Sequence, residues 1–393
     1  MNIRKTIAAV CSCALLLGTM TACAKQTTND DTTIQEESTL KTYIPNTDNV
    51  KPLGRTKLVD DTLWMAFSGS GAEFTFNGTK ASVTIAGDVN AANANNEDNQ
   101  ARIAIYVNGE RVVDDMINAA EETYTVFESD TPADCDVKIV KLSETAMSTA
   151  AIKSIEVDSA TGIKPAEKKE HFIEFIGDSI TCGYGVDDED RDHHFSTKTE
   201  DVTKAYAYKT AEALNADYSM VSISGYGIIS GYSDGKRKIS NQTIPQYYNK
   251  LGFCYGTYNG QTPAGSKWDF TGYTPDVIVI NLGTNDDSYT QTDSERQMEY
   301  CTEYTEFIKT IRENNPDATI FCTLGIMGDR LFEYVQLAVN NYTEETGDTN
   351  IHTLKFDVQN PADGYAADWH PTATTHTKAS EKLAAEIKSV MGW

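Results

Sequence analysis

The hydrophobic pattern of this chain changes near residue 165, and this change constrains the fold more than any other feature. Before it, apolar and polar residues alternate in short segments at 72–76, 81–85, 103–107, 124–127, 137–142 and 152–157. Asn77-Gly78 and Asn108-Gly109 are typical of hairpin turns, and no segment of helical period interrupts the series. Residues 46–165 are therefore predicted to form an all-β sandwich, of the jelly-roll type.

After this change, short apolar runs alternate with amphipathic segments. Strands are predicted at 171–176, 218–223, 276–280, 318–323 and 351–356, and helices at 204–214, 294–314, 330–341 and 376–391. Strand–helix alternation with β-branched runs indicates a parallel sheet that is covered on both faces. Residues 166–393 are therefore predicted to be an α/β domain with a flavodoxin-like sheet. Ligands of such sheets bind beyond the carboxyl ends of the strands.

The N-terminus carries the signature of export. Two basic residues precede an apolar run at 7–17, which is too short to span a bilayer. Small residues and Cys23 follow, and this arrangement resembles a bacterial lipobox, in which the cysteine is lipidated. Residues 1–23 are predicted to be a lipoprotein signal peptide, and the mature chain to be anchored to the membrane at the cell surface. Met20 is unusual for a lipobox, so cleavage by the ordinary signal pathway is the alternative.

Composition limits the class of partner and the use of cysteine. The formal net charge of −25 excludes nucleic acid as a partner, because phosphate binding needs a clustered basic face, whereas a neutral substrate suits it. Residues 24–45 are polar and acidic, and they are predicted to be a flexible linker. The five cysteines after Cys23 are scattered and form no CxxC pair, so we expect buried or free thiols rather than a zinc site or a full disulfide framework.

Four residues with catalytic potential follow or lie between the predicted strands. Ser179 ends the Gly-Asp-Ser segment directly after the first strand, and a serine hydroxyl needs a base beside it to act as a nucleophile. Gly225 follows the second strand, Asn285 follows the third, and His370 lies in the last loop. We expect His370 to be the general base. The N–H groups of Ser179 and Gly225, with the Asn285 amide, form the predicted oxyanion hole.

These four blocks, in this order, resemble the SGNH (GDSL-type) hydrolase superfamily. Segments 64–83 and 276–286 resemble the N-terminal jelly roll and the hydrolase domain of carbohydrate esterase family 2. The resemblance runs from residue 51 to the C-terminus. It implies a serine esterase that uses an acyl-enzyme and no cofactor to remove O-acetyl groups from polysaccharides such as acetylated xylan or glucomannan. A lipase or thioesterase on the same fold, or an inactive carbohydrate-binding surface lipoprotein, are the alternatives.

The group that orients His370 is not settled by the spacing. The superfamily usually has an acid three residues before this histidine, but that position holds Ala367, and Asp368 lies two residues before. Either the Asp368 carboxylate completes a Ser-His-Asp triad or a backbone carbonyl orients the imidazole ring.

Other candidates are less specific. Four aromatic residues could stack on sugar rings or belong to the core: Tyr184, Tyr226, Trp268 and Trp369. His193 and His194 lie beside five acidic residues, but the spacing matches neither an EF-hand nor HExxH, so a solvated loop and no metal site are predicted. Asp178, beside Ser179, is predicted to brace its loop rather than to act as an acid.

Overall fold

The structure is a computed structural model that describes residues 40–393. Cys23 and the predicted signal peptide lie outside the described residues. Lys41–Tyr43 form strand β1, which pairs with β9. The linker predicted over 24–45 therefore ends earlier than expected, because these three residues belong to a sheet.

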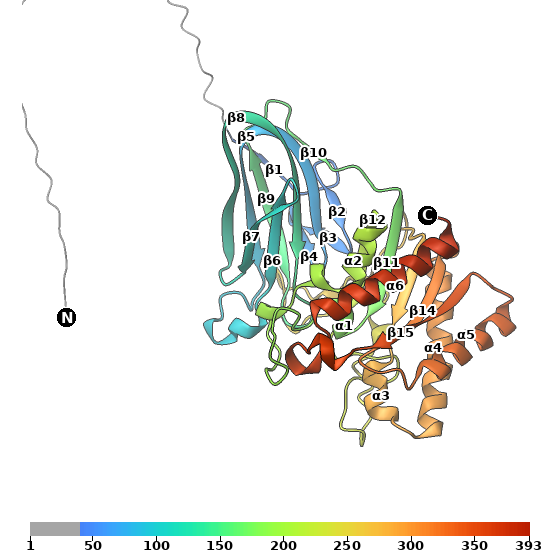
Figure 1. The fold of residues 1–393 in the computed structure, drawn as a ribbon. Coiled ribbons are helices and arrows are strands. Elements are labelled where there is room, and N and C mark those ends of the chain that lie inside the picture. Colours follow the sequence, from blue (N-terminus) through green and yellow to red (C-terminus); the bar gives the residue numbers. More distant parts are fainter. Residues whose placement is uncertain (1–39) are drawn as a thin grey trace, which may run out of the picture. The chain divides into compact units, whose positions relative to one another are not determined.

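A curled antiparallel sheet of ten strands forms the N-terminal β domain, at the upper left of Figure 1. Its strands are β1, β2 (Lys51–Leu53), β3 (Thr56–Val59), β4 (Thr62–Met65), β5 (Gly71–Gly87), β6 (Arg102–Val107), β7 (Glu110–Met116), β8 (Glu121–Lys141), β9 (Ala150–Val157) and β10 (Ile163–Pro165). The order is β3-β4-β9-β5-β8-β6-β7, with β1 on β9 and with β2 and β10 on β5. The long strands β5 and β8 curl around a core that includes Phe74, Ile103 and Ile139. The predicted all-β sandwich is confirmed.

One predicted turn in this domain is wrong and another is confirmed. Asn108 and Gly109 have positive φ and join β6 to β7, as a hairpin of this type requires. Asn77-Gly78, in contrast, lies inside the continuous strand β5, where the pairing with β8 shifts register. The Asp158 carboxylate accepts the N–H groups of Thr79 and Lys80, which follow Gly78. These hydrogen bonds stabilise an irregularity within the strand instead of a chain reversal.

The α/β domain is built on a five-stranded parallel sheet in the order β12-β11-β13-β14-β15. Its strands are β11 (His171–Gly177), β12 (Ala216–Ser222), β13 (Val277–Asn281), β14 (Thr319–Ile326) and β15 (Ile351–Val358). Its helices are α1 (Ser179–Cys182), α2 (Tyr206–Ala213), α3 (Thr284–Thr290), α4 (Ser294–Asn314), α5 (Phe332–Thr346) and α6 (Ala373–Met391). The order is the flavodoxin-like order that the strand–helix alternation predicted, so the fold class is confirmed.

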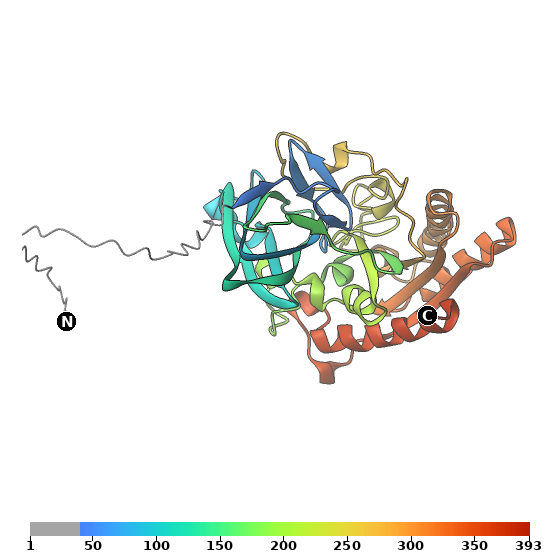
Figure 2. The same ribbon diagram turned by 90° about the horizontal axis from the view of Figure 1, so that it is seen from above.

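Alternate residues of the central strands explain why helices cover both faces of this sheet. Ile278 and Ile280 of β13 pack in the cluster formed with α4 and α5, whereas Val277 and Val279 pack in the cluster formed with α2 and α6. A strand buried on both faces has no polar side to alternate with, which is why its sequence is a continuous apolar run. Figure 2 shows α6 along one face of the sheet and α4 and α5 on the other side.

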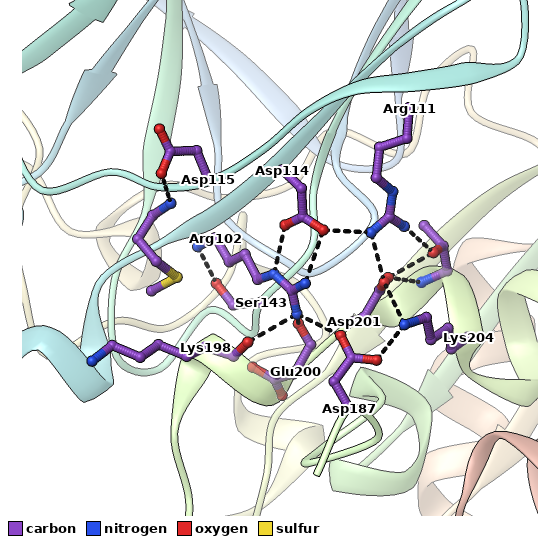
Figure 3. Close-up of polar contacts among 12 residues, drawn as sticks. Arg102, Arg111, Asp114, Asp115, Ser143, Asp187, Lys198, Glu200, Asp201 and Lys204 are labelled. Atoms are coloured by element: carbon purple, nitrogen blue, oxygen red, sulfur yellow. Dashed lines mark hydrogen bonds and ion pairs between the residues drawn. The ribbon is translucent and has the colours of Figure 1, made fainter.

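The two domains share a core and an ion-pair network. Leu53 and Leu142 of the β domain belong to the same apolar cluster as α2 and α6. Arg102 of β6 binds Asp187 of the α/β domain, with 2.8 Å between Nη1 and Oδ2, and Arg111 of β7 binds Asp201, with 2.9 Å between Nη1 and Oδ2 (Figure 3). The segment that follows the predicted nucleophile is thereby fastened to the β domain.

Two further observations concern cysteines and membranes. The five cysteines in the described residues are free and buried, as the sequence predicted: Cys135, Cys182, Cys254, Cys301 and Cys322. Within residues 40–393, no helix combines the length and the apolar character needed to cross a bilayer.

Candidate active site

Ser179 lies at the junction of β11 and α1. Gly177 ends the strand, and a Cβ there would come within 2.0 Å of the Thr181 hydroxyl oxygen, so this position needs glycine. The Asp178 carboxylate caps α1 by accepting the N–H of Ile180 at 3.0 Å. Local structure therefore explains the glycine and the aspartate that precede the serine. Together they place Ser179 at the carboxyl end of a central strand.

His370 reaches Ser179 from the loop between β15 and α6. Its Nε2 lies 2.9 Å from the Ser179 Oγ. Its Nδ1 lies 3.1 Å from the carbonyl oxygen of Ala367, and since a carbonyl can only accept, Nδ1 carries the proton. Nε2 is therefore the free acceptor that faces the serine hydroxyl. Sequence reasoning expected this pair to meet, and the structure brings it together.

The Asp368 carboxylate makes no hydrogen bond to His370 in the described structure. It accepts the Tyr184 hydroxyl at 2.5 Å and contacts Nδ1 of His194 at 3.0 Å. Asp368 has a φ of +49°, in the left-handed region. Of the two alternatives that the spacing left open for orienting His370, this geometry favours the backbone carbonyl of Ala367 over the Asp368 carboxylate.

Tyr184 fixes the plane of the histidine ring. The two rings are stacked with centroids 3.9 Å apart and an interplanar angle of 21°. Tyr184 was one of four aromatic residues that could stack on a sugar ring or belong to the core, and here His370 covers one face of its ring and Asp368 accepts its hydroxyl. Asp368 thus acts on the base indirectly, through the tyrosine that holds the ring.

The predicted oxyanion donors converge behind Ser179. Gly225 has a φ of +79° and open space on the side where a Cβ would lie. Neither its N–H nor that of Ser179 has an acceptor within residues 40–393. The Asn285 amide donates to the carbonyl oxygen of Tyr226 at 2.9 Å and, over a longer 3.3 Å, to the Asp178 carboxylate. Three separate chain segments are therefore joined by this one amide.

Asp286 ties the Gly225 loop to α3, a role that sequence reasoning did not assign. Its buried carboxylate accepts the N–H groups of Ile228 at 2.9 Å, Ile229 at 2.7 Å and Ser230 at 3.1 Å. Burial raises the pKa of Asp286 to about 6, although these three donors lower it. Burial also raises the pKa of Asp178 to about 7, and the charge of Asp286 adds to that effect.

The remaining aromatic candidates have three different surroundings. Trp369 is 47% exposed next to His370, beside Tyr365 and with the Arg191 guanidinium 4.2 Å above its ring. Tyr226 is buried and packs against other aromatic rings. Trp268 packs against the cluster around Trp64 and under the Arg55 guanidinium, which favours the core alternative over a sugar platform.

His193 and His194 lie in an exposed acidic loop, as predicted. The Nδ1 of His193 lies 3.0 Å from the Asp188 carboxylate, whose hydrogen bond raises the pKa of this histidine. His194 contacts Asp368, so the loop borders the catalytic residues.

Comparisons with known proteins agree with this geometry. The sequence model of the GDSL-like Lipase/Acylhydrolase family matches residues 175–378, and that of the Carbohydrate esterase 2 N-terminal domain matches residues 53–166. The chain is 33% identical over 334 residues to the cellulase/esterase CelE of Acetivibrio thermocellus, covering 84% of this chain but only 38% of that protein. It is 25% identical over 365 residues to an acetylxylan esterase / glucomannan deacetylase of Cellvibrio japonicus, covering 91% and 93% of the two chains.

Solved structures give the same result. A family two carbohydrate esterase from Clostridium thermocellum, in complex with cellohexaose, superposes with a TM-score of 0.74 and 31% identity, over 88% of this chain and 99% of that one. An acetyl xylan esterase from the rumen bacterium Butyrivibrio proteoclasticus superposes with a TM-score of 0.80 and 24% identity, over 90% and 99%.

The position of Asp368 predicts a mild effect of Asp368→Asn. A buried triad aspartate contributes about 10⁴ in kcat, but here the Ala367 carbonyl keeps the tautomer, so we expect a loss of only about tenfold. The kcat for p-nitrophenyl acetate measures it, with Asp190→Asn in the same exposed loop as a control that leaves kcat unchanged. A loss near 10⁴ would restore Asp368 to the triad.

The burial of His370 predicts an acid-tolerant base. Desolvation lowers the pKa of His370 to about 4, and only the neutral ring can accept the serine proton. The ring can therefore accept the serine proton above this pKa, and this ability is lost as the pH falls through the pKa. We expect kcat/KM to be flat from pH 7 to about pH 5 and to fall about tenfold per unit below pH 4, with folding followed by circular dichroism. A midpoint near the ordinary histidine pKa of about 6.5 would contradict this.

Proposed function

The chain belongs to the GDSL-like lipase/acylhydrolase family and carries the N-terminal domain of carbohydrate esterase family 2, and on this basis we propose that it is a serine esterase that removes O-acetyl groups from polysaccharides. The observation that carries the proposal is the 2.9 Å contact between Ser179 Oγ and His370 Nε2 at the carboxyl ends of the parallel sheet. An intact nucleophile–base pair also speaks against an inactive binding protein.

The geometry supports a two-step acyl transfer. Nε2 of His370 takes the hydroxyl proton while Oγ of Ser179 attacks the acetyl carbonyl carbon, and the N–H groups of Ser179 and Gly225 receive the negative oxygen with the Asn285 amide. For the amide to do so, its long hydrogen bond to Asp178 is the one to be replaced. The imidazolium gives its proton to the departing sugar oxygen, which leaves as the hydroxyl, and water, deprotonated by His370, then attacks the acetyl-Ser179 ester and releases acetate.

Substrate class is inferred from the relatives and from the border of the site. The curated relatives of matching length are acetylxylan esterase / glucomannan deacetylases, which makes acetylated xylan and glucomannan the first candidates. Trp369 offers an exposed aromatic ring next to the base, the kind of surface on which a sugar ring can stack. The polar neighbours Arg191 and His194 do not suit a long acyl chain, which disfavours a lipase.

Acetate release tests this proposal. We expect acetate from acetylated xylan and glucomannan in preference to acetylated peptidoglycan, and faster hydrolysis of p-nitrophenyl acetate than of the octanoate ester. Ser179→Ala should lose at least about 10³ in kcat and keep its fold, with only a residue of catalysis from the oxyanion donors. A variant that kept a tenth of the wild-type kcat, or a preference for octanoate, would contradict the proposal.

We also propose that the enzyme is displayed on the cell surface by a lipid on Cys23. The support is the apolar run at 7–17 followed by small residues and this cysteine. Labelling with a clickable palmitate analogue in a bacterial host should mark the wild-type protein and leave Cys23→Ala unmarked. An unlabelled wild type, or cleavage at another residue, would favour the ordinary export route, and equal labelling of both proteins would place the lipid on a residue other than Cys23.

A further inference from the structure

The β domain sends one buried carboxylate to the rear of the catalytic loops. Strand β8 ends at Lys141, and the chain continues through Glu144, whose carboxyl side chain is fully buried. An Oε2 atom of Glu144 accepts the backbone N–H of Ser224 at 2.7 Å. Ser224 directly precedes Gly225, whose unpaired N–H is one of the proposed oxyanion donors.

Two buried carboxylates therefore bracket Gly225. Asp286 of the α/β domain holds the three N–H groups of residues 228–230 on the downstream side. Glu144 of the β domain holds the N–H of Ser224 on the upstream side. Gly225 has a positive φ and nothing lies where a Cβ would be, and its carbonyl oxygen accepts the N–H of Tyr232 at 2.8 Å, so the direction of its N–H depends on how the backbone is held on either side.

We propose that Glu144 is a positioning residue of the catalytic centre, and that its carboxylate fixes the backbone that presents the Gly225 N–H to the oxyanion. This inference rests on the proposed esterase function and adds a role for the β domain within it. An oxyanion donor must lie within a few tenths of an ångström of its place, since misplacement by about 1 Å costs about 10²-fold in rate.

Two hydrogen bonds hold the backbone of Glu144 in place. Its own N–H donates to the Glu200 carboxylate at 2.7 Å, and its carbonyl oxygen accepts the Lys141 ammonium at 2.7 Å. Glu200 lies in the segment that Arg102 and Arg111 fasten to the β domain (Figure 3). The position of Glu144 is thus set by the interface between the two domains.

Burial also changes the pKa values of the two glutamates in this cluster. Burial raises the pKa of Glu144, the Ser224 hydrogen bond lowers it, and burial with the charge of Glu144 raises the pKa of Glu200 further. The Oε1 atoms of both glutamates have no partner within residues 40–393. A carboxamide in place of the Glu144 carboxylate can therefore keep the Ser224 hydrogen bond with its oxygen and place its NH2 group where the unpaired Oε1 lies.

Two single substitutions separate the position of the oxygens from the carboxyl group itself. Glu144→Gln keeps the length and an acceptor oxygen but replaces the carboxyl group with an amide, whereas Glu144→Asp keeps a carboxyl group but withdraws its oxygens by one methylene. We expect kcat for p-nitrophenyl acetate within about threefold of wild type for Glu144→Gln. For Glu144→Asp we expect kcat at least about tenfold lower with KM little changed, because a displaced donor acts on the transition state.

A matched control distinguishes this effect from general loosening of the domain. Asp88 is another buried carboxylate of the β domain, and it accepts the N–H groups of Asn90 and Thr149, remote in sequence from the oxyanion loop. Asp88→Ala should lower the Tm and leave kcat unchanged. A kcat loss in Asp88→Ala equal to that in Glu144→Asp would overturn the proposal.

The other outcomes are equally decisive. Equal kcat in the wild type and in a folded Glu144→Asp, a larger loss in Glu144→Gln than in Glu144→Asp, or a Glu144→Asp that does not fold would each overturn the positioning role. An active wild type in those experiments leaves the esterase proposal intact. A wild type without esterase activity would overturn the proposed function, and this inference with it.

Discussion

The hydrogen bond between Ser179 and His370 is the interaction on which the site depends, and it joins residues 191 positions apart in the sequence. The parallel sheet makes it possible. Because parallel strands have their carboxyl ends at one edge, the loops after β11, β12, β13 and β15 all open on the same side. The apolar runs that form the strands are thus what bring a nucleophile, a base and the oxyanion donors together.

The groups around this hydrogen bond orient the imidazole of His370 rather than give it a charge. The Ala367 carbonyl selects the tautomer of His370, and the Tyr184 ring holds its plane. Burial lowers the pKa of the imidazole to about 4, so the ring stays neutral and ready to accept a proton. Asp368, tied to Tyr184, supports this arrangement from one step away.

The sequence predicted the fold well where burial determines which residues are apolar. The inner strands β13 and β14 were visible because apolar runs rich in β-branched residues are buried on both faces, whereas α3, with the sequence TNDDSYT, has no apolar period and was missed. Asn77-Gly78 misled because a turn signal also fits a strand irregularity. Local spacing left the partner of His370 open and could not reveal Glu144 or Asp286, since their acceptor roles depend on backbone N–H groups 80 and 58 residues away.

The central claim is that Ser179 is acylated with His370 as its base, and trapping the acyl-enzyme tests it most directly. Rapid mixing of the protein with p-nitrophenyl acetate, acid quench and peptide mass spectrometry measure where the acetyl group resides. The account predicts a burst of about one p-nitrophenol per chain, with the acetyl group on the peptide that contains Ser179. Turnover without acetyl on that peptide, or acetyl carried by another residue, would contradict it.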